Sequence, residues 1–130
     1  LPTFRRRRGG QILITASVAG YRGLPKAAPY NATKAALISL TESLRPELAQ
    51  ESVWIRVINP GFVETPLTDK NDFTMPALIT PQRAAEEIVK RLDDTGFEIA
   101  FPRRFVWAMK LMRQLPYSLF FALTRRMVRS

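Results

Sequence analysis

Two residues of the chain, Tyr30 and Lys34, have side chains and a spacing that suit acid–base chemistry. They are four positions apart, so on a helix they share one face and their side chains can meet. A lysine cation beside a phenol favours the phenolate, although a free tyrosine titrates only at about pH 10. A tyrosine in this setting can give and take a proton nearer to neutral pH.

A serine stands thirteen residues before the tyrosine, in the segment Thr15-Ala-Ser-Val-Ala-Gly20. If the hydroxyl of Ser17 reaches the same place, it can hold a carbonyl or alcohol oxygen while the proton moves. The three side chains together therefore predict acid–base work on a C–O group. The competing interpretation is a helix-surface pair without function and a serine that merely caps a loop.

The composition argues against several other kinds of site. The 130 residues contain no cysteine and no histidine, which argues against disulfides, thiolate sites, histidine-based triads and most zinc sites, so we expect no metal site. The start Leu-Pro-Thr-Phe lacks the apolar core of a signal peptide, and its first residue is not methionine, which favours a fragment. With no cysteine to form disulfides, we expect a cytoplasmic protein.

Hydrophobic periodicity predicts alternating strands and helices. Three short apolar runs between turn signals are typical of buried strands: residues 11–16, 53–58 and 97–101. Two longer stretches repeat apolar residues at helical spacings: residues 29–50 and 81–93. Pro46 should kink or weaken the end of the first helix. The inward face of the second is expected to hold Ala84, Ala85, Ile88, Val89 and Leu92.

This strand–helix–strand–helix–strand order is typical of a parallel sheet packed against helices, the α/β class. Three strands are few for a sheet that must be covered on both faces, and the first strand lacks a neighbour on one side. We therefore expect a piece of a larger sheet; a small complete α/β domain is the alternative.

The strand, Ser17, Tyr30, Lys34 and a Pro60-Gly61 turn follow one another in an order that resembles the short-chain dehydrogenase/reductase family. The resemblance extends from about residue 10 to residue 65. Tyr30-Asn-Ala-Thr-Lys34 is similar to the family's Tyr-x-x-x-Lys core, and Asn59-Pro-Gly-Phe-Val-Glu-Thr65 is similar to its segment beside the nicotinamide. One departure is Ala16, where the family frequently has a second serine.

The resemblance implies a role for each matching residue. Tyr30 would be the general acid and base, Lys34 would lower the pKa of Tyr30 and bind the nicotinamide ribose, and Ser17 would polarise the substrate carbonyl. Four further residues would line the nicotinamide pocket: Pro60, Gly61, Val63 and Thr65. The implied reaction is hydride transfer between NAD or NADP and a carbonyl or alcohol substrate.

The resemblance also implies a fold, the C-terminal half of a Rossmann-like, doubly wound parallel sheet, formed here by residues 1–102. The family's glycine-rich Gly-x-x-x-Gly-x-Gly loop and its Asn-Ala-Gly segment do not occur in the sequence, and we expect both before Leu1. Such a loop binds the pyrophosphate at a helix N-terminus, so the chain alone should bind cofactor poorly. The alternative is a catalytically inactive truncated product or a basic binding module.

Basic charge gathers at the two ends of a chain whose net charge is +9. The run Arg5–Arg8 lacks interleaved aromatic residues, so a solvated connection is favoured over a nucleic-acid patch. Residues 103–130 are basic and aromatic, and Pro116 interrupts them. They form either a lid over an apolar substrate, such as a lipid or steroid, or a peripheral membrane contact. The family resemblance further implies a homo-oligomer formed through the helix of Tyr30.

Overall fold

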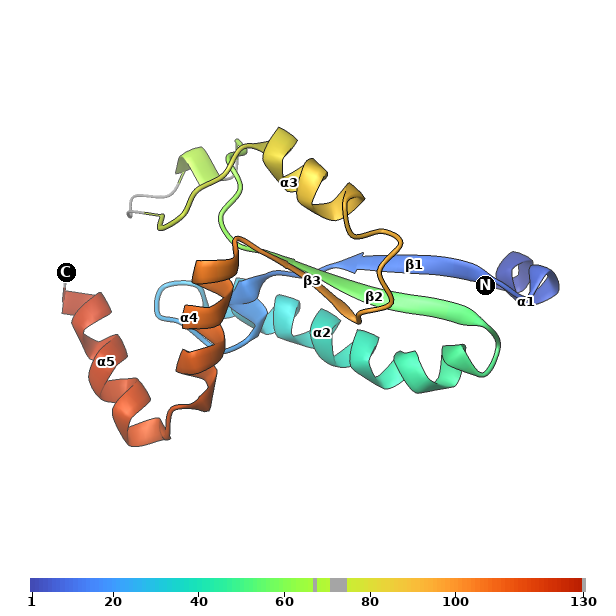
Figure 1. The fold of residues 1–130 in the computed structure, drawn as a ribbon. Helices are drawn as coiled ribbons and strands as arrows, with labels where there is room; N and C mark the ends of the chain where they lie inside the picture. The colour runs from blue at the N-terminus through green and yellow to red at the C-terminus, as the bar shows by residue number, and fades with distance from the viewer. Residues whose placement is uncertain (67, 71–74, 130) are drawn as a thin grey trace.

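The computed structural model of the chain describes residues 1–66, 68–70 and 75–129, and a three-stranded parallel sheet lies at its centre (Figure 1). The strands β1 (Gly10–Thr15), β2 (Val53–Pro60) and β3 (Glu98–Phe101) lie in the order β1-β2-β3. Gly10 pairs with Val53 at one end of the β1–β2 ladder, and Pro60 pairs with Phe101 at the end of the β2–β3 ladder. The predicted α/β class and the three parallel strands are confirmed.

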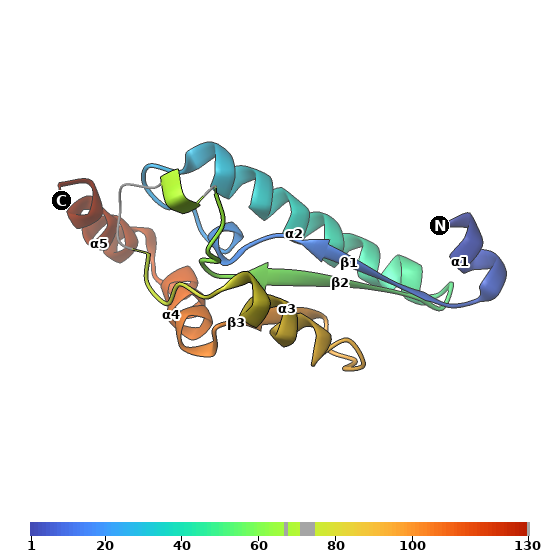
Figure 2. The same ribbon diagram turned by 90° about the horizontal axis from the view of Figure 1, so that it is seen from above.

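Helices cover both faces of this sheet (Figures 1 and 2): α2 (Ala28–Ala49) lies on one side and α3 (Pro81–Val89) on the other. The central strand β2 is buried almost throughout, with Trp54 as its exposed residue. Beneath α2, Leu48 packs with Val53 and Ile55, and beneath α3, Ala84 packs with Ile58, Ile99 and Phe101. This two-sided burial explains why most of the β2 sequence is apolar, and it also encloses the polar side chains of Arg56 and Asn59.

The helix α2 agrees with its sequence prediction to within a residue at each end. Pro29 stands in its first turn, where the lost N–H has no partner in any case. Pro46 lies inside the helix, which nevertheless continues to Ala49.

The helix α3 begins as predicted but is shorter. Thr80 caps it by accepting a hydrogen bond from the Arg83 amide at 3.2 Å, and Pro81 follows at the first helical position. The helix ends at Val89 rather than near residue 93. Ala84 is buried as expected, but the predictions for Ala85 and Val89 were wrong, since both are exposed. Because the stripe of Ala84 and Ile88 faces the sheet, their next neighbours turn about 100° away from it.

The arginine run was predicted to be a connection, but it belongs to the short helix α1 (Pro2–Arg7). Arginine is a good helix former, and Pro2 provides a start. Arg8 ends the helix in the left-handed conformation with φ 49°. Arg5 forms an ion pair with Glu51 on the surface, and Phe4 packs against the backbone of Gly10.

Between β2 and α3 the chain is irregular, as expected from its prolines. It contains a 3-10 turn, η2 (Thr68–Lys70), and a bridge between Val63 and Ile79. Residues 67 and 71–74 of this stretch lie outside the described residues.

The C-terminal segment forms two helices, α4 (Arg103–Gln114) and α5 (Tyr117–Arg129), and Pro116 interrupts them as predicted. Val106 and Met109 of α4 belong to the same apolar cluster as Tyr21, Ile38 and Val57. The helix α4 is therefore packed into the core. Across the residues that the structure describes, no helix combines the length and apolar character needed to cross a membrane.

Candidate active site

Ser17 lies just beyond the carboxyl end of β1, where the chain enters the 3-10 turn η1 (Val18–Gly20). Its side chain is buried, and its hydroxyl accepts a hydrogen bond from the Ala19 amide at 3.1 Å. The same hydroxyl donates to the carbonyl oxygen of Pro60 over a long 3.4 Å. Ser17 is thus linked to the first of the four residues that were predicted to line a nicotinamide pocket.

Tyr30 and Lys34 occupy the first two turns of α2, on the same face. The Lys34 ammonium lies 5.6 Å from the centre of the Tyr30 ring. It also donates a hydrogen bond of 3.4 Å to the carbonyl oxygen of Thr15, two residues before Ser17. The phenol itself is 43% exposed, so a substrate can reach it. Lys34 therefore connects the tyrosine to the end of the strand that carries the serine.

Two residues that the sequence did not single out hold this arrangement together. Gly20 crosses α2 so closely that an added Cβ would lie 2.8 Å from the carbonyl carbon of Lys34. The side-chain NH2 group of Asn31 donates a hydrogen bond of 2.9 Å to the carbonyl oxygen of Leu24. This bond fixes the loop before the helix. A glycine and an asparagine beside the motif were the only sequence signals for these roles.

The four predicted cofactor residues follow one another from the end of β2. The Gly61 amide donates to the Phe101 carbonyl oxygen at 2.8 Å, and an added Cβ on Gly61 would lie 2.8 Å from the Phe105 ring of α4. Val63 forms the bridge with Ile79, and the Thr65 amide donates to the Thr68 hydroxyl at 2.8 Å. The structure thus brings Pro60 to Ser17, whereas the contacts of Val63 and Thr65 lie within the following loop.

A half-buried carboxylate, Glu98, lies behind this strand end, and sequence reasoning missed it. It accepts hydrogen bonds from the Tyr21 hydroxyl, from the side-chain NH2 group of Asn59 at 2.8 Å, and from the Lys110 ammonium. Burial alone would raise the pKa of Glu98, but the hydrogen bonds from Lys110, Tyr21 and Asn59 leave it below its ordinary value. A carboxylate inside a predicted strand was the available signal.

Tyr21 differs from Tyr30 in its surroundings. Burial, followed by the hydrogen bond to Glu98, raises the pKa of Tyr21 far above its ordinary value. Its phenol therefore stays neutral and donates to the carboxylate. The neutral tyrosine, Glu98 and Lys110 join β3 and α4 to the loop that follows Ser17.

Arg22 fixes the turn between α4 and α5. Its guanidinium donates to the carbonyl oxygens of Met112 at 3.0 Å and Arg113 at 3.1 Å, and also to that of Leu115. It lies 3.9 Å from the centre of the Phe120 ring. Cations at a helix C-terminus complement the exposed carbonyl groups. The loop between Ser17 and Tyr30 thus also holds the C-terminal segment.

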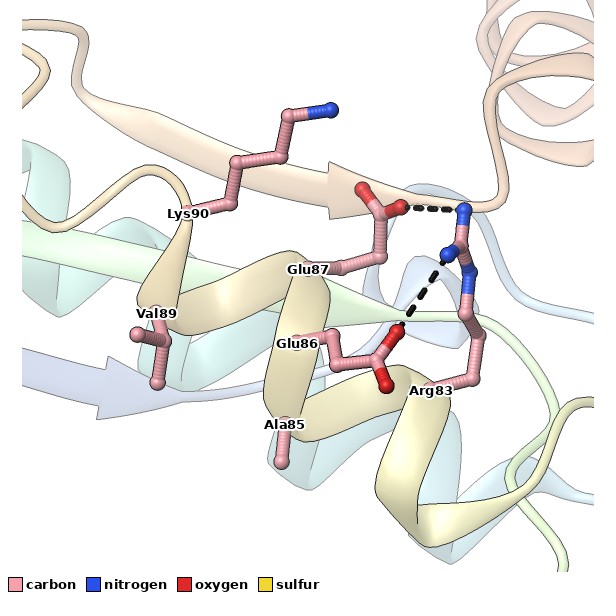
Figure 3. A pocket seen from close by; sticks show the side chains of 6 residues that line it. All are labelled: Arg83, Ala85, Glu86, Glu87, Val89 and Lys90. Carbon is pink, nitrogen blue, oxygen red and sulfur yellow. Dashed lines mark hydrogen bonds and ion pairs between the residues drawn. The ribbon is translucent and has the colours of Figure 1, made fainter.

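A shallow groove on the outer side of α3 offers no comparable chemistry (Figure 3). Its lining comes from this helix and from Lys90, which follows it, and Arg83 forms ion pairs of 3.3 Å with Glu86 and 2.9 Å with Glu87. These are the (i, i+3) and (i, i+4) pairs of an exposed helix. Within the described ranges, no group of histidine, cysteine, aspartate or glutamate is arranged to hold a metal ion.

Comparison with known proteins places this geometry in a family. Residues 1–75 match the family described as short chain dehydrogenase. An uncharacterized oxidoreductase of Myxococcus xanthus is 37% identical over 127 residues, which are 98% of this chain and 50% of that protein. The uncharacterized oxidoreductase Rv0945 of Mycobacterium tuberculosis is 41% identical over 119 residues, 89% of this chain and 46% of that protein.

Solved structures show the same fold. A short chain dehydrogenase from Burkholderia cenocepacia in complex with NADP has a TM-score of 0.80 at 24% identity, covering 95% of this chain and 51% of that one. A short chain dehydrogenase/reductase from Burkholderia phymatum in complex with NAD has a TM-score of 0.73 at 22% identity, covering 87% and 50%. The chain spans about half the length of the relatives that it matches, and it belongs to the short-chain dehydrogenase family of oxidoreductases.

Proposed function

We propose that this chain supplies the acid–base half of an NAD(P)-dependent oxidoreductase that interconverts a carbonyl compound and its alcohol. The observation that carries the proposal is the pairing of Tyr30 and Lys34 on one helix face, with the Lys34 ammonium bonded to the strand end beside Ser17. A half-exposed phenol beside a cation is suited to proton transfer with a bound oxygen.

Each of the three side chains has a distinct task in the proposed reaction. Tyr30 donates a proton to the carbonyl oxygen during reduction, and Lys34 stabilises the phenolate that remains. Ser17 holds the same oxygen through its hydroxyl. Its present bond to the Pro60 carbonyl is long, at 3.4 Å, and can be exchanged for one to a substrate. When bound, the nicotinamide supplies the hydride.

The residues present fit the nicotinamide end of such a cofactor. Among the residues that the structure describes, the Lys34 ammonium has one hydrogen-bond acceptor, the carbonyl oxygen of Thr15, and we propose that its other N–H groups bind a ribose. We propose that Pro60, Gly61, Val63 and Thr65 line the nicotinamide pocket. The cofactor is either NAD or NADP, and both occur in the names of the solved structures that share the fold.

We further propose that α4 forms one wall of the substrate site. Phe105 packs against Gly61, and its ring centre lies 5.6 Å from that of Phe62. These apolar rings beside the proposed nicotinamide pocket favour a lipophilic substrate. A contact of residues 103–130 with a membrane is a separate proposal, because it depends on their outward side chains.

Self-association through α2 is also proposed, by analogy with the family. Leu40 on this helix is 51% exposed, which suits a helix that packs against a second copy. Light scattering tests this interface by comparing the mass of the unchanged chain with that of the Leu40→Asp variant. If the unchanged chain is oligomeric and the variant has the same mass, the proposed interface is rejected.

Activity is tested in a protein that joins residues 1–130 to the N-terminal half of the Myxococcus xanthus relative. Consumption of NADH and NADPH is measured with a panel of apolar ketones and aldehydes. Tyr30→Phe should lower turnover by about 10²–10⁴-fold with its helix content unchanged. Tyr117→Phe, at an exposed tyrosine on α5, is the matched control and should keep full turnover.

Full turnover in Tyr30→Phe would overturn the assignment. The second candidate, a catalytically inactive product or basic binding module, predicts that the folded fusion binds dinucleotide but turns over none of the panel. The basic character of the run Arg5–Arg8 and of residues 103–129 is the observation that favours a binding module.

A further inference from the structure

Exposed apolar side chains gather in the C-terminal helices. Of the fourteen large apolar side chains that are exposed in the described part of the chain, eight lie between residues 107 and 128. They are Trp107, Leu111, Tyr117, Leu119, Phe121, Leu123, Met127 and Val128. Single exposed apolar residues are ordinary on a protein surface, but a concentration of them indicates an interaction site.

The helix α5 contributes little to the core. Among its thirteen described residues, the buried ones are Phe120 and Thr124. In Figures 1 and 2 the helix lies beyond the end of the sheet and follows α4 through a tight turn. The Arg22 guanidinium holds that turn through three carbonyl oxygens. The helix is thus held at its start, while most of its surface faces outward.

One outward stripe of α5 is apolar and aromatic. Tyr117 and Phe121 are one turn apart, with their rings stacked at 5.7 Å between centres, and Val128 lies two turns further on the same side. Their exposed fractions are 72%, 51% and 58%. Three arginines of the helix are exposed. Arg125 lies beside this stripe, Arg129 lies further around the helix, and Arg126 lies on the side opposite to the stripe.

The charge of the segment is of one sign. Residues 103–129 contain seven arginines and lysines, and every one of the eleven acidic residues of the chain lies at or before Glu98. A helix with apolar and aromatic side chains on one face and arginines on the other is suited to a membrane interface. Its cations attract anionic headgroups, each by about 1 kcal/mol.

A second copy of the chain fits this surface less well. In a symmetric dimer the same patch meets itself, so the arginines of one copy would face those of the other. A lipid surface instead satisfies the apolar stripe and the cations together. We propose that α5 binds the surface of an anionic membrane, with Tyr117, Phe121 and Val128 at the acyl boundary and Arg125, Arg126 and Arg129 near the headgroups.

This proposal does not depend on the proposed enzymatic function. The chain is mixed with vesicles of phosphatidylcholine alone or with added phosphatidylserine, and bound protein is separated by flotation. We expect binding to the anionic vesicles that weakens as salt is added. Equal partitioning to both vesicle types, or no binding to the anionic ones, would overturn the proposal.

Matched variants then locate the contact. Val128→Asp should weaken binding by about tenfold or more, because a carboxylate replaces an apolar side chain at the interface. Val89→Asp makes the same change at a valine of α3 that is 65% exposed, and it should bind as the unchanged chain does. Equal losses in both variants would show a general charge effect and overturn the assignment to α5.

A second pair of variants tests the contribution of the arginine charges to binding. Neutralising Arg125, Arg126 and Arg129 to glutamine should weaken binding on the order of 100-fold, whereas the same change at Arg6, Arg7 and Arg8, at the end of α1, should not. Circular dichroism confirms that each variant keeps its helices, and Phe121→Ala replaces Val128→Asp if the aspartate unfolds α5. If sedimentation instead shows a dimer that Val128→Asp dissociates, a second copy is the occupant and the proposal fails.

Discussion

Replacing Glu98 with alanine should destabilise this chain more than any change to a surface ion pair. The carboxylate accepts hydrogen bonds from the Tyr21 hydroxyl, the Asn59 amide and the Lys110 ammonium. These donors come from the loop after β1, from β2 and from α4. One substitution therefore removes the shared acceptor of three separate parts of the fold.

The magnitude follows from the exposure of each donor. Tyr21 and Asn59 are buried, so water cannot replace the lost acceptor, and leaving a buried polar group unsatisfied costs about 1–3 kcal/mol for each. In the described part of the chain the side-chain oxygen of Asn59 has no hydrogen-bond partner, and the loss of Glu98 also removes the acceptor of its NH2 group. Lys110 is 39% exposed and regains water, which adds at most about 1 kcal/mol. The expected loss is about 2–7 kcal/mol in the free energy of unfolding.

Urea unfolding followed by circular dichroism measures this loss. The control is Glu51→Ala, which breaks the exposed ion pair with Arg5 and should cost about 1 kcal/mol or less. Glu98→Gln keeps the shape and one acceptor oxygen, so it should fall between the two. If Glu98→Ala costs no more than Glu51→Ala, the three hydrogen bonds do not hold the fold together and the reasoning is refuted.

The same network predicts a dependence on pH. Because the folded state lowers the pKa of Glu98 below its ordinary value of 4.5, the stabilisation is complete above that value. It is lost as the pH falls through the lowered folded pKa, where the carboxylate gains a proton. The unchanged chain should therefore lose stability on acidification, and its advantage over Glu98→Gln should disappear. A constant difference between the two at all pH values would contradict the depressed pKa.

Two further substitutions test the supports around the candidate site, and a third tests the loop between α3 and β3, which buried Arg56 of β2 contacts. Gly20→Ala places a Cβ 2.8 Å from the Lys34 backbone and should lower the unfolding free energy by about 1–3 kcal/mol, measured in urea. Arg22→Ala removes the donors to three carbonyl oxygens, so amide exchange should speed up in residues 115–129 while exchange in the sheet is unchanged. Arg56→Met leaves the carbonyl oxygens of Gly96 and Arg91 without their donor and should cost about 2–5 kcal/mol in urea; a loss under about 0.5 kcal/mol would contradict its role.

The sheet and its two covering helices could be predicted from the sequence because their signals are local. Apolar runs between turn residues locate the strands, and spacings of three and four locate α2 and α3. The inward face of α3 was harder, because Ala85 and Val89 are apolar and yet exposed. Which of two apolar neighbours faces the sheet depends on how the whole helix is rotated against it. The arginine run was misassigned because its helix has no apolar stripe; Phe4 and the ion pair of Arg5 with Glu51 hold this helix against the rest of the chain.

In the candidate site, too, the residues that act on near neighbours in the sequence could be predicted, and those that act on distant ones could not. Tyr30 and Lys34 are one helical turn apart, so their meeting follows from the helix alone. Arg22 and Glu98 act on partners far away in the sequence: Arg22 binds carbonyl groups about ninety residues later, and Glu98 accepts from Tyr21, 77 residues earlier. No periodicity reports such a pairing. A polar residue inside a predicted strand or loop indicates only that some partner must exist.

The parallel topology explains why these separate pieces meet at one edge of the sheet. The chain leaves β1 at its carboxyl end, so Ser17 and the first turn of α2, with Tyr30, both lie there. The carboxyl ends of β2 and β3 share this edge, which brings Pro60 next to Ser17 and starts α4 beside Gly61. Because α4 begins directly after β3, its first turn lies at this edge as well. Variation in this segment is therefore expected to change the substrate side of the site while the acid–base residues stay fixed.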